Sequence, residues 1–395
     1  MPPSPLPINP SILAWAREES GYPLERVAKR LQVKEEKVAA WEAGERQPTL
    51  RQLQNMAKFL HRPFSVFFLP NRPELPPLAM EYRRLPRVVP GHESPELRLA
   101  LRQMLTRREL TLNLMEELGD PIPEFALTAH LQEGPMAVGS RLREALGIRV
   151  DEQLGWANEW QAWRGWRTAV DRLGVLVFQF AGVPLEEVRG VALPHTPLPV
   201  AGVNSKEFPD SRSFTLLHEL VHLMLLIGQD EAPALREKRS PDEWNDVERF
   251  AESAASHALI PEVSLREQLR QLNLQQASWS LDDVRRLARR FRLTPKATAT
   301  RLRESGFMDW PRYRQWLEEW DAWVKTLPVR KGFATPVDKT LGRAGRPFTL
   351  LVLDALAANR ITAVDASRYL DLKYEHFDKL RTRLTEGSDS GANIE

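Results

Sequence analysis

The spacing of apolar residues changes several times along the chain. From Ile12 to Leu69, short segments with apolar residues three or four positions apart alternate with turn residues, which predicts four or five short helices. Residues 94–118 and 136–173 keep the helical spacing over longer stretches. Short apolar runs between Gly and Pro predict three strands, at Gly174–Phe180, Val188–Leu193 and Pro199–Asn204.

The second half of the chain returns to helical spacing. A strongly apolar helix is expected at Arg212–Leu226, and a second helix at Trp244–Leu259 ends before Pro261. Helical spacing continues to Asp321 and resumes at Phe348–Leu384. We therefore expect a multidomain, mainly α protein with one α+β core. The expected parts are an all-α domain at 1–70, a Pro-rich linker and helical connector at 71–150, the α+β core at 151–265, a helical extension at 266–330, a small C-terminal helical unit at 331–387 and a tail at 388–395.

Composition limits the chemistry that the chain can carry. The 395 residues contain no Cys, so a metal site must use His and carboxylate ligands, and no thiol nucleophile is available. A formal net charge of +2 is too small to indicate nucleic-acid binding by itself. The N-terminus lacks the basic start and apolar run of a signal peptide, and the longest apolar stretches are too short to span a bilayer. We therefore expect a cytoplasmic protein with no membrane partner.

One run has a specific chemical pattern, His218-Glu219-Leu220-Val221-His222. Residues four apart share one face of a helix, so both imidazoles can bind one metal ion. Glu219 then lies beside the ion, where its carboxylate can take a proton from a bound water. The apolar flanks predict a buried helix, and buried His and Glu side chains are costly unless they are paired or bind metal. We therefore favour a metal site over a chance spacing.

A catalytic zinc site needs a third protein ligand and one open position for water. The next predicted helix has Glu248 and Glu252 on one face. Glu248 can ligate the ion while Glu252 accepts a hydrogen bond from a ligand His and fixes its tautomer. The spacing equally allows Glu248 to be a solvated helix charge. His257, nine residues after Glu248, is out of phase and is interpreted as a structural histidine.

The sequence around these residues is similar to the ImmA/IrrE metallopeptidase family. The similarity is carried by Val203-Asn204-Ser205, by the run RSFTLLHELVH at Arg212–His222, and by Glu248, Ala251, Ala254, Ala255, Ile260 and Pro261 in one register. The resemblance implies a zincin-like peptidase core, a zinc cofactor with Glu248 as third ligand beside His218 and His222, and peptide hydrolysis with Glu219 as base. Glu252 stands where the family usually has Asn, which places a second acidic group near the ion.

The group that stabilises the transition state is left open. His195, Arg212 and Asn204 are the candidates for contact with the transition state or the substrate, and for His195 and Arg212 a structural role is the favoured interpretation. The resemblance also implies a sheet beside the active helix. We expect an extended substrate to pair along the strand at Pro199–Asn204.

The N-terminal domain shows helix–turn–helix patterning. The segments Leu24–Val33 and Lys34–Glu42, followed by the turn Gly44–Pro48, resemble the XRE-type helix-turn-helix family. In that family the second helix of the pair lies in the major groove of DNA. Glu35 and Glu36 would there face phosphates, so protein docking stays as an alternative to DNA binding. The DNA-binding candidates are Lys34, Lys37, Arg46 and Arg51.

These patterns together predict a zinc-dependent regulatory endopeptidase with a DNA-binding-type module. The family resemblance implies cleavage of a cognate XRE-type transcriptional repressor, in stress or mobile-element control. One alternative is a helix-turn-helix transcription regulator or toxin–antitoxin-type component in which the zinc site is sensory or structural. Another is a zinc-independent binding protein. The expected partners are the repressor and double-stranded DNA, and formation of a homodimer is left open.

Overall fold

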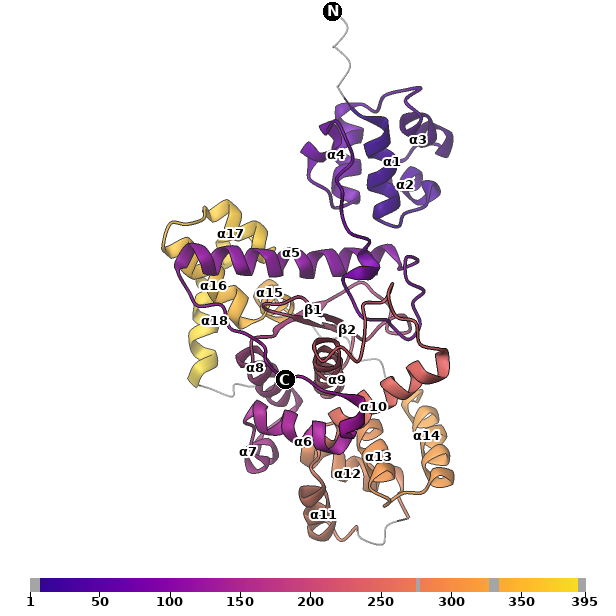
Figure 1. The fold of residues 1–395 in the computed structure, drawn as a ribbon. Coiled ribbons are helices and arrows are strands. Elements are labelled where there is room, and N and C mark those ends of the chain that lie inside the picture. The colour runs from indigo at the N-terminus through magenta and orange to yellow at the C-terminus, as the bar shows by residue number, and fades with distance from the viewer. Residues whose placement is uncertain (1–7, 275–277, 327–333, 390–395) are drawn as a thin grey trace, which may run out of the picture.

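The computed structural model describes residues 8–274, 278–326 and 334–389. Within these ranges the chain is mainly helical and has one three-stranded sheet, which confirms the predicted fold class (Figure 1). Most of the N-terminal arm and most of the expected tail at 388–395 lie outside the described residues. No helix in the described ranges combines the length and apolarity needed to cross a membrane.

The N-terminal domain is a bundle of short helices around a compact apolar core. Trp41, Leu53 and Phe67 are fully buried at its centre. A capping box between Thr49 and Gln52 begins the fourth helix, because the two side chains satisfy each other's free backbone N–H groups. The elements are α1 Pro10–Glu19, α2 Leu24–Leu31, α3 Glu35–Glu42, α4 Leu50–Phe59 and the 3-10 helix η1 Phe64–Phe68.

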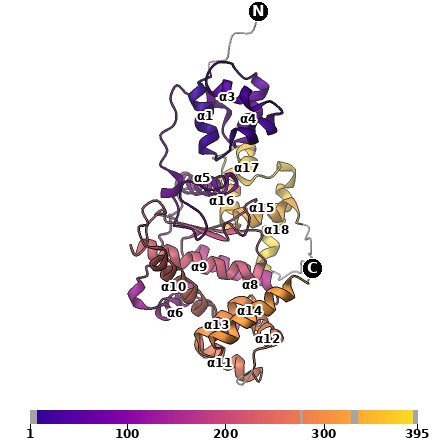
Figure 2. The same ribbon diagram turned by 90° about the vertical axis from the view of Figure 1, so that its right-hand side faces the viewer.

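This domain rests on the N-terminal half of the long helix α5 (Pro95–Leu118), as both orthogonal views show (Figures 1 and 2). Arg98 donates to the backbone oxygens of Glu18 (3.3 Å) and Glu19 (3.4 Å), and Arg102 donates to Glu19 O (3.0 Å). These carbonyls lie at the end of α1, where cations are favoured by the helix dipole. The contact therefore joins the N-terminal domain to α5 through arginines on carbonyl oxygens.

The sheet lies between two helical layers. Its strands are β1 Leu176–Phe180, β2 Gly190–Leu193 and β3 Val200–Asn204, close to the predicted runs. Their order is β1-β3-β2, with β3 parallel to β1 and antiparallel to β2. β3 is therefore paired on both sides. The expectation that a substrate pairs along Pro199–Asn204 is wrong, because a central strand has no free edge.

One face of the sheet is covered by α5, which precedes the strands in the chain, and by the C-terminal helices, which follow them. Met104 of α5 lies against Gly202, where an added Cβ would stand 2.6 Å from the Met104 sulfur. Phe178 packs edge-on to Phe348, with ring centroids 6.0 Å apart. Leu341 O and Gly342 O accept hydrogen bonds from the buried Arg167. The C-terminal helices are α15 Pro336–Ala344, α16 Arg346–Ala357, α17 Ala363–Leu370 and α18 Phe377–Asp389.

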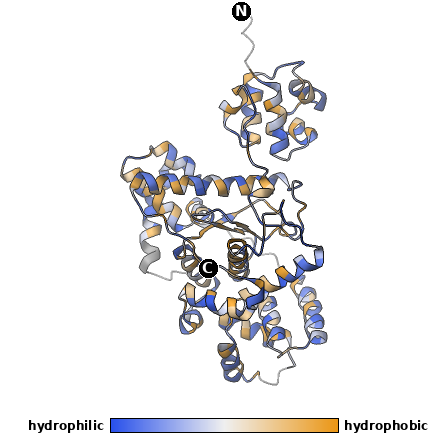
Figure 3. Cartoon of the chain, viewed as in Figure 1, coloured by the Kyte–Doolittle hydropathy of each residue, from blue (hydrophilic) through white to orange (hydrophobic). Residues whose placement is uncertain are grey.

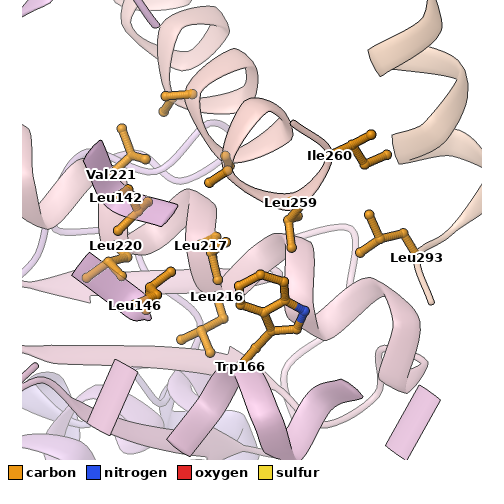
Figure 4. Close-up of a cluster of buried hydrophobic side chains, with 14 of the residues drawn as sticks. Leu142, Leu146, Trp166, Leu216, Leu217, Leu220, Val221, Leu259, Ile260 and Leu293 are labelled. Atoms are coloured by element: carbon orange, nitrogen blue, oxygen red, sulfur yellow. The ribbon is translucent and has the colours of Figure 1, made fainter. Parts of the chain in front are cut away.

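The opposite face packs on α9 (Pro209–Ile227), which is apolar on nearly all sides and lies at the centre of the molecule (Figure 3). Its residues Leu216, Leu217 and Leu220 form one cluster with Trp166 and Leu142 (Figure 4). A helix of this composition is stable only when it is surrounded by other elements. Those elements include α6 Pro135–Leu146, α8 Glu159–Arg172 and α10 Pro241–Leu259, and the short helix α7 Val150–Gly155 packs on α12.

α10 packs very closely on α6 because of one glycine. A Cβ at Gly139 would stand 2.5 Å from Ala254 O and 2.7 Å from His257 Cβ, so a larger residue would push the helices apart. The Nδ1 of His257 lies 2.8 Å from Ser253 O and its Nε2 lies 3.1 Å from Arg301, in keeping with the predicted structural role. The remaining helices are α11 Glu262–Gln271, α12 Leu281–Phe291, α13 Pro295–Glu304 and α14 Trp310–Val324.

The turn between α2 and α3 occurs a second time, between α12 and α13. Gln32 (φ 56°, ψ 45°) and Arg292 (φ 55°, ψ 43°) end the first helix of each pair in the left-handed region. In both turns the next residue donates its N–H to an alanine carbonyl five residues earlier, at 3.0 and 3.1 Å. The α2–α3 and α12–α13 pairs therefore share the same connection, a repeat that the sequence patterns did not reveal.

The second helix of the later pair is covered by α14. Lys296 Nζ of α13 forms an ion pair with Asp321 (2.7 Å), and the hydroxyl oxygens of Thr300 and Tyr313 lie 2.9 Å apart. α13 is thus packed on its outer side, whereas α3 carries the exposed residues Glu35 and Glu36. The shared turn alone does not determine whether the second helix is accessible.

Candidate metal centre

Helix α9 brings His218 and His222 onto one face, as their spacing predicts. Their Nε2 atoms lie 3.1 Å apart, and their rings are nearly perpendicular. His222 is fully buried and 12% of the His218 side chain is exposed, so only one of the two is open toward solvent. The helix begins at Pro209, whose missing N–H costs nothing at a first-turn position.

Helix α10 brings the Glu248 carboxylate to the two imidazoles. Glu248 Oε2 lies 3.4 Å from His218 Nε2, and Glu248 Oε1 lies 3.4 Å from His222 Nε2. The three possible ligand atoms all lie within 4.8 Å of one another. The structure thus brings together His218, His222 and Glu248, the three residues that the sequence analysis selected as ligands.

This donor set fits a zinc ion. Zinc is bound in proteins by imidazole nitrogen and carboxylate oxygen, and its catalytic sites use three protein ligands and one open position. The two Nε2 atoms and the carboxylate lie close together, and Glu248, like His218, is partly exposed. It lines a depression of about 490 Å³ on the outer side of α10, bounded by Asp242, Asn245, Asp246, Glu248, Arg249 and Glu252.

The second nitrogen of His222 is held by a residue that the sequence analysis missed. His222 Nδ1 lies 2.6 Å from Glu231 Oε2, and both side chains are buried. Burial raises the pKa of Glu231 to about 8 and lowers the pKa of His222 well below its usual value. A neutral imidazole fixed at Nδ1 leaves its Nε2 lone pair free for a metal ion.

The expectation that Glu252 orients a ligand histidine is therefore not met. Glu252 is exposed on α10, and among the described residues it makes no hydrogen bond to His218 or His222. Glu231 takes that place from the loop after α9, nine residues beyond His222. The loop has no periodicity, so its sequence gave no signal that this carboxylate turns back toward the helix.

A second residue missed by the sequence analysis is Arg83, from the Pro-rich stretch before α5. Its Nε and Nη2 donate to the two carboxylate oxygens of Glu219 at 3.0 and 3.2 Å, and its Nη1 donates to Glu248 Oε1 at 2.6 Å. Burial alone would raise the pKa of Glu248, but Arg83 and the imidazoles outweigh burial and hold that pKa well below its usual value. Both carboxylates are thus paired with one buried guanidinium.

The three candidates for substrate or transition-state contact serve the backbone or lie apart from the cluster. Asn204 Nδ2 donates to Val183 O and Val188 O, so its amide braces a loop. Arg212 donates to backbone oxygens of the turn before α9. His195 Nε2 lies 2.8 Å from a carboxylate oxygen of Glu81. In the described part of the chain, none of the three has a hydrogen bond or ion pair with His218, Glu219, His222 or Glu248.

The DNA-binding candidates all lie in the N-terminal domain, but they differ in exposure. Lys34, Arg46 and Arg51 are exposed, and within the described residues none of the three has an ion-pair partner. Lys37 is half-buried, with its Nζ 5.8 Å from the centroid of the Trp41 ring. Three of the four cations are therefore free to meet an anionic partner.

The fold and the cluster define a helix-turn-helix domain joined to a mainly helical α/β domain with a histidine–carboxylate centre. Residues 13–67 match the model of the helix-turn-helix family, and residues 170–303 match that of the IrrE N-terminal-like domain, a peptidase family. The two matches correspond to an XRE-type helix-turn-helix domain and an ImmA/IrrE-like domain within one chain. No curated protein shows significant similarity to it.

Proposed function

We propose that this protein is a zinc-dependent endopeptidase in which His218, His222 and Glu248 hold zinc and Glu219 is the general base. The observation that carries the proposal is the convergence of two Nε2 atoms, 3.1 Å apart, with the Glu248 carboxylate. The match of residues 170–303 to a peptidase family supports the same class of reaction.

A bound zinc ion would supply an activated water and polarise the carbonyl of the scissile peptide bond. Glu219 takes the proton of the attacking water and passes it to the leaving amine. Burial keeps His222 neutral, and the contact of Glu231 with its Nδ1 orients the ring so that Nε2 stays available as a ligand. The buried position of Glu219 limits competing solvent around the base.

We further propose that the substrate is an XRE-type transcriptional repressor. The N-terminal domain (1–70) is fastened to α5, which packs on the sheet beside the proposed hydrolytic unit. A repressor that shares an operator with this domain, or pairs with it, is then held near the site at a high effective concentration. Docking of this kind supplies the selectivity that an extended backbone alone does not.

The N-terminal domain also fits a role in DNA binding. The exposed cations Lys34, Arg46 and Arg51 lie at the start of α3, in the loop after α3 and at the start of α4, respectively. Cations in such positions contact phosphates, while the second helix of the pair enters the major groove. The acidic residues Glu35 and Glu36 at the start of α3 weaken the general attraction to phosphates.

The test is to incubate the zinc-loaded full chain with XRE-type repressors and with casein, and to map the cuts by mass spectrometry. We expect one or a few defined cuts in a repressor and slow degradation of casein. Chelation of the zinc should abolish the cuts, because the activated water is lost. Rapid degradation of casein with every repressor intact would contradict a regulatory substrate and indicate a general peptidase.

One observation favours the alternative of a regulator whose zinc site is sensory or structural. The arginines that receive the N-terminal domain lie on α5, directly after the segment that carries Arg83 into the cluster. In this alternative, a change at the centre would pass to the helix-turn-helix domain through the stretch from Arg83 to Arg102. Zinc-dependent DNA affinity without any hydrolysis would support this alternative over the peptidase.

A further inference from the structure

Arg83 lies outside residues 170–303, yet it contacts two members of the proposed centre. Only 2% of its side chain is exposed. Its fork-shaped guanidinium binds both oxygens of Glu219 and still reaches one oxygen of Glu248. The other Glu248 oxygen faces His218. The oxygen that accepts from Arg83 also lies 3.4 Å from His222 Nε2, so the guanidinium and the two imidazoles share the Glu248 carboxylate.

The segment around Arg83 is a fixed part of the fold. Arg83 N donates to Ala192 O of the edge strand β2 (3.2 Å), and Ala234 N donates to Tyr82 O (2.8 Å). The Tyr82 ring is fully buried, and its hydroxyl is hydrogen-bonded to the buried Glu93. Withdrawing the backbone of this segment from the centre would require Tyr82 to leave the core. The fold therefore holds the backbone of Arg83 beside the centre, and this segment does not have the form of an inhibitory strap that could detach.

We propose that Arg83 is a positioning residue of the centre, which fixes Glu219 as the base and Glu248 as a ligand. The inference rests on the proposed function and extends it, because a site residue then comes from the stretch between the two matched domains. The planar fork of arginine can hold both carboxylates at once. Without it, two buried carboxylates lose their shared partner and are free to turn or to take up protons.

The test compares Arg83→Gln and Arg83→Lys with the matched control Arg84→Gln in the full chain. Arg84, on the same segment, donates to Arg239 O and stacks over Trp244, and within the described residues its side chain has no hydrogen bond or ion pair with the centre. Zinc affinity is measured by competition with a chelator, and kcat and KM are measured separately on a cleaved repressor. Circular dichroism and thermal melting of each metal-free protein report folding.

We expect Arg83→Gln to weaken zinc affinity about 10- to 100-fold, as is usual when a partner of a ligand is removed. It should lower kcat more than it changes KM, Arg83→Lys should recover part of both losses, and Arg84→Gln should match the wild type. Folded Arg83→Gln protein with unchanged or tighter zinc binding overturns the proposal. If Arg83→Gln does not fold, Arg83→Lys decides, and an unchanged zinc affinity there also overturns it.

Failure of the proposed function is distinguishable from failure of this inference. A wild-type protein that binds zinc but hydrolyses nothing contradicts the peptidase, while zinc affinity still tests the role of Arg83. A wild-type protein that binds no zinc contradicts both.

Discussion

The candidate metal centre and the surface around α3 place their charged side chains in opposite environments. At the centre on α9 and α10, Glu219, His222 and Arg83 are buried, and each has a polar partner. On the α2–α3 pair and the turn after it, Lys34 and Arg46 are exposed and have no ion-pair partner within the described residues. The fold fixes the partners of the charged groups at the centre, whereas the exposed cations can bind an external anion.

This difference determines how each region responds to substitution. Removing one partner of a buried pair costs about 3–5 kcal/mol, because the remaining charge stays buried without compensation. An exposed charge contributes about 0–1 kcal/mol to stability and acts mainly on association with partners. Substitutions at the centre should therefore have large effects on metal and catalysis, and those near the α2–α3 turn small, salt-dependent effects on binding.

The largest effect is expected for Glu248→Ala. Loss of the third ligand should reduce zinc from about one ion per chain to nearly none, because two imidazoles alone bind zinc weakly. Metal content after dialysis measures this. The control is Asp246→Ala, an exposed residue of the same helix whose ion-pair partner in the described part of the chain is Arg249. Full zinc occupancy in Glu248→Ala would mean that another residue is the third ligand.

Glu219→Gln should keep zinc and lose hydrolysis. The amide cannot take a proton from water, so kcat should fall by about 10²–10⁴, the usual contribution of a general base. Metal content and repressor cleavage, measured on the same preparation, check the two halves of this expectation. Cleavage at the wild-type rate would show that the base is a different group.

A smaller effect is expected when the partner of His222 is removed. Glu231→Gln should weaken zinc affinity about 10- to 100-fold, because the imidazole loses the carboxylate that orients it. Glu252→Gln is the matched control, since Glu252 is exposed on α10. Competition with a chelator measures both. A loss for Glu252→Gln with none for Glu231→Gln would reverse the assignment drawn from the contacts.

The smallest effect is expected for the exposed cations of the N-terminal domain. If the N-terminal domain binds duplex DNA, Arg46→Gln should weaken this binding modestly. The dependence of log affinity on log salt concentration should become shallower by an amount that corresponds to about one phosphate contact. Lys296→Gln, on the covered helix of the repeated pair, should leave binding unchanged because Lys296 is already paired with Asp321. Fluorescence anisotropy over a salt series measures this. Full-length protein without salt-dependent binding to any duplex would favour protein docking.

The sequence predicted the parts of the fold and centre that follow a period. His218 and His222 are four residues apart on an apolar helix, so their shared face follows from helix geometry. The three strands were predicted from continuous apolar runs between Gly and Pro, because a strand buried on both faces is apolar at every position. Arg83 and Glu231 lie in irregular stretches, where the direction of a side chain depends on tertiary packing. The repeated turn at Gln32 and Arg292 was missed because a left-handed residue other than Gly has no strong sequence signal.

The apolar packing of α5 and α16 on the sheet determines which fragments of this chain can fold without the rest. Residues 170–303 include all three strands but neither Met104 nor Phe348, which lie on their underside. A fragment with those limits would expose Phe178 and the neighbouring apolar positions to water as one continuous apolar surface. Such a surface favours aggregation. The smallest autonomous unit therefore extends well beyond the matched domain on both sides, and its two ends must meet before the sheet is shielded.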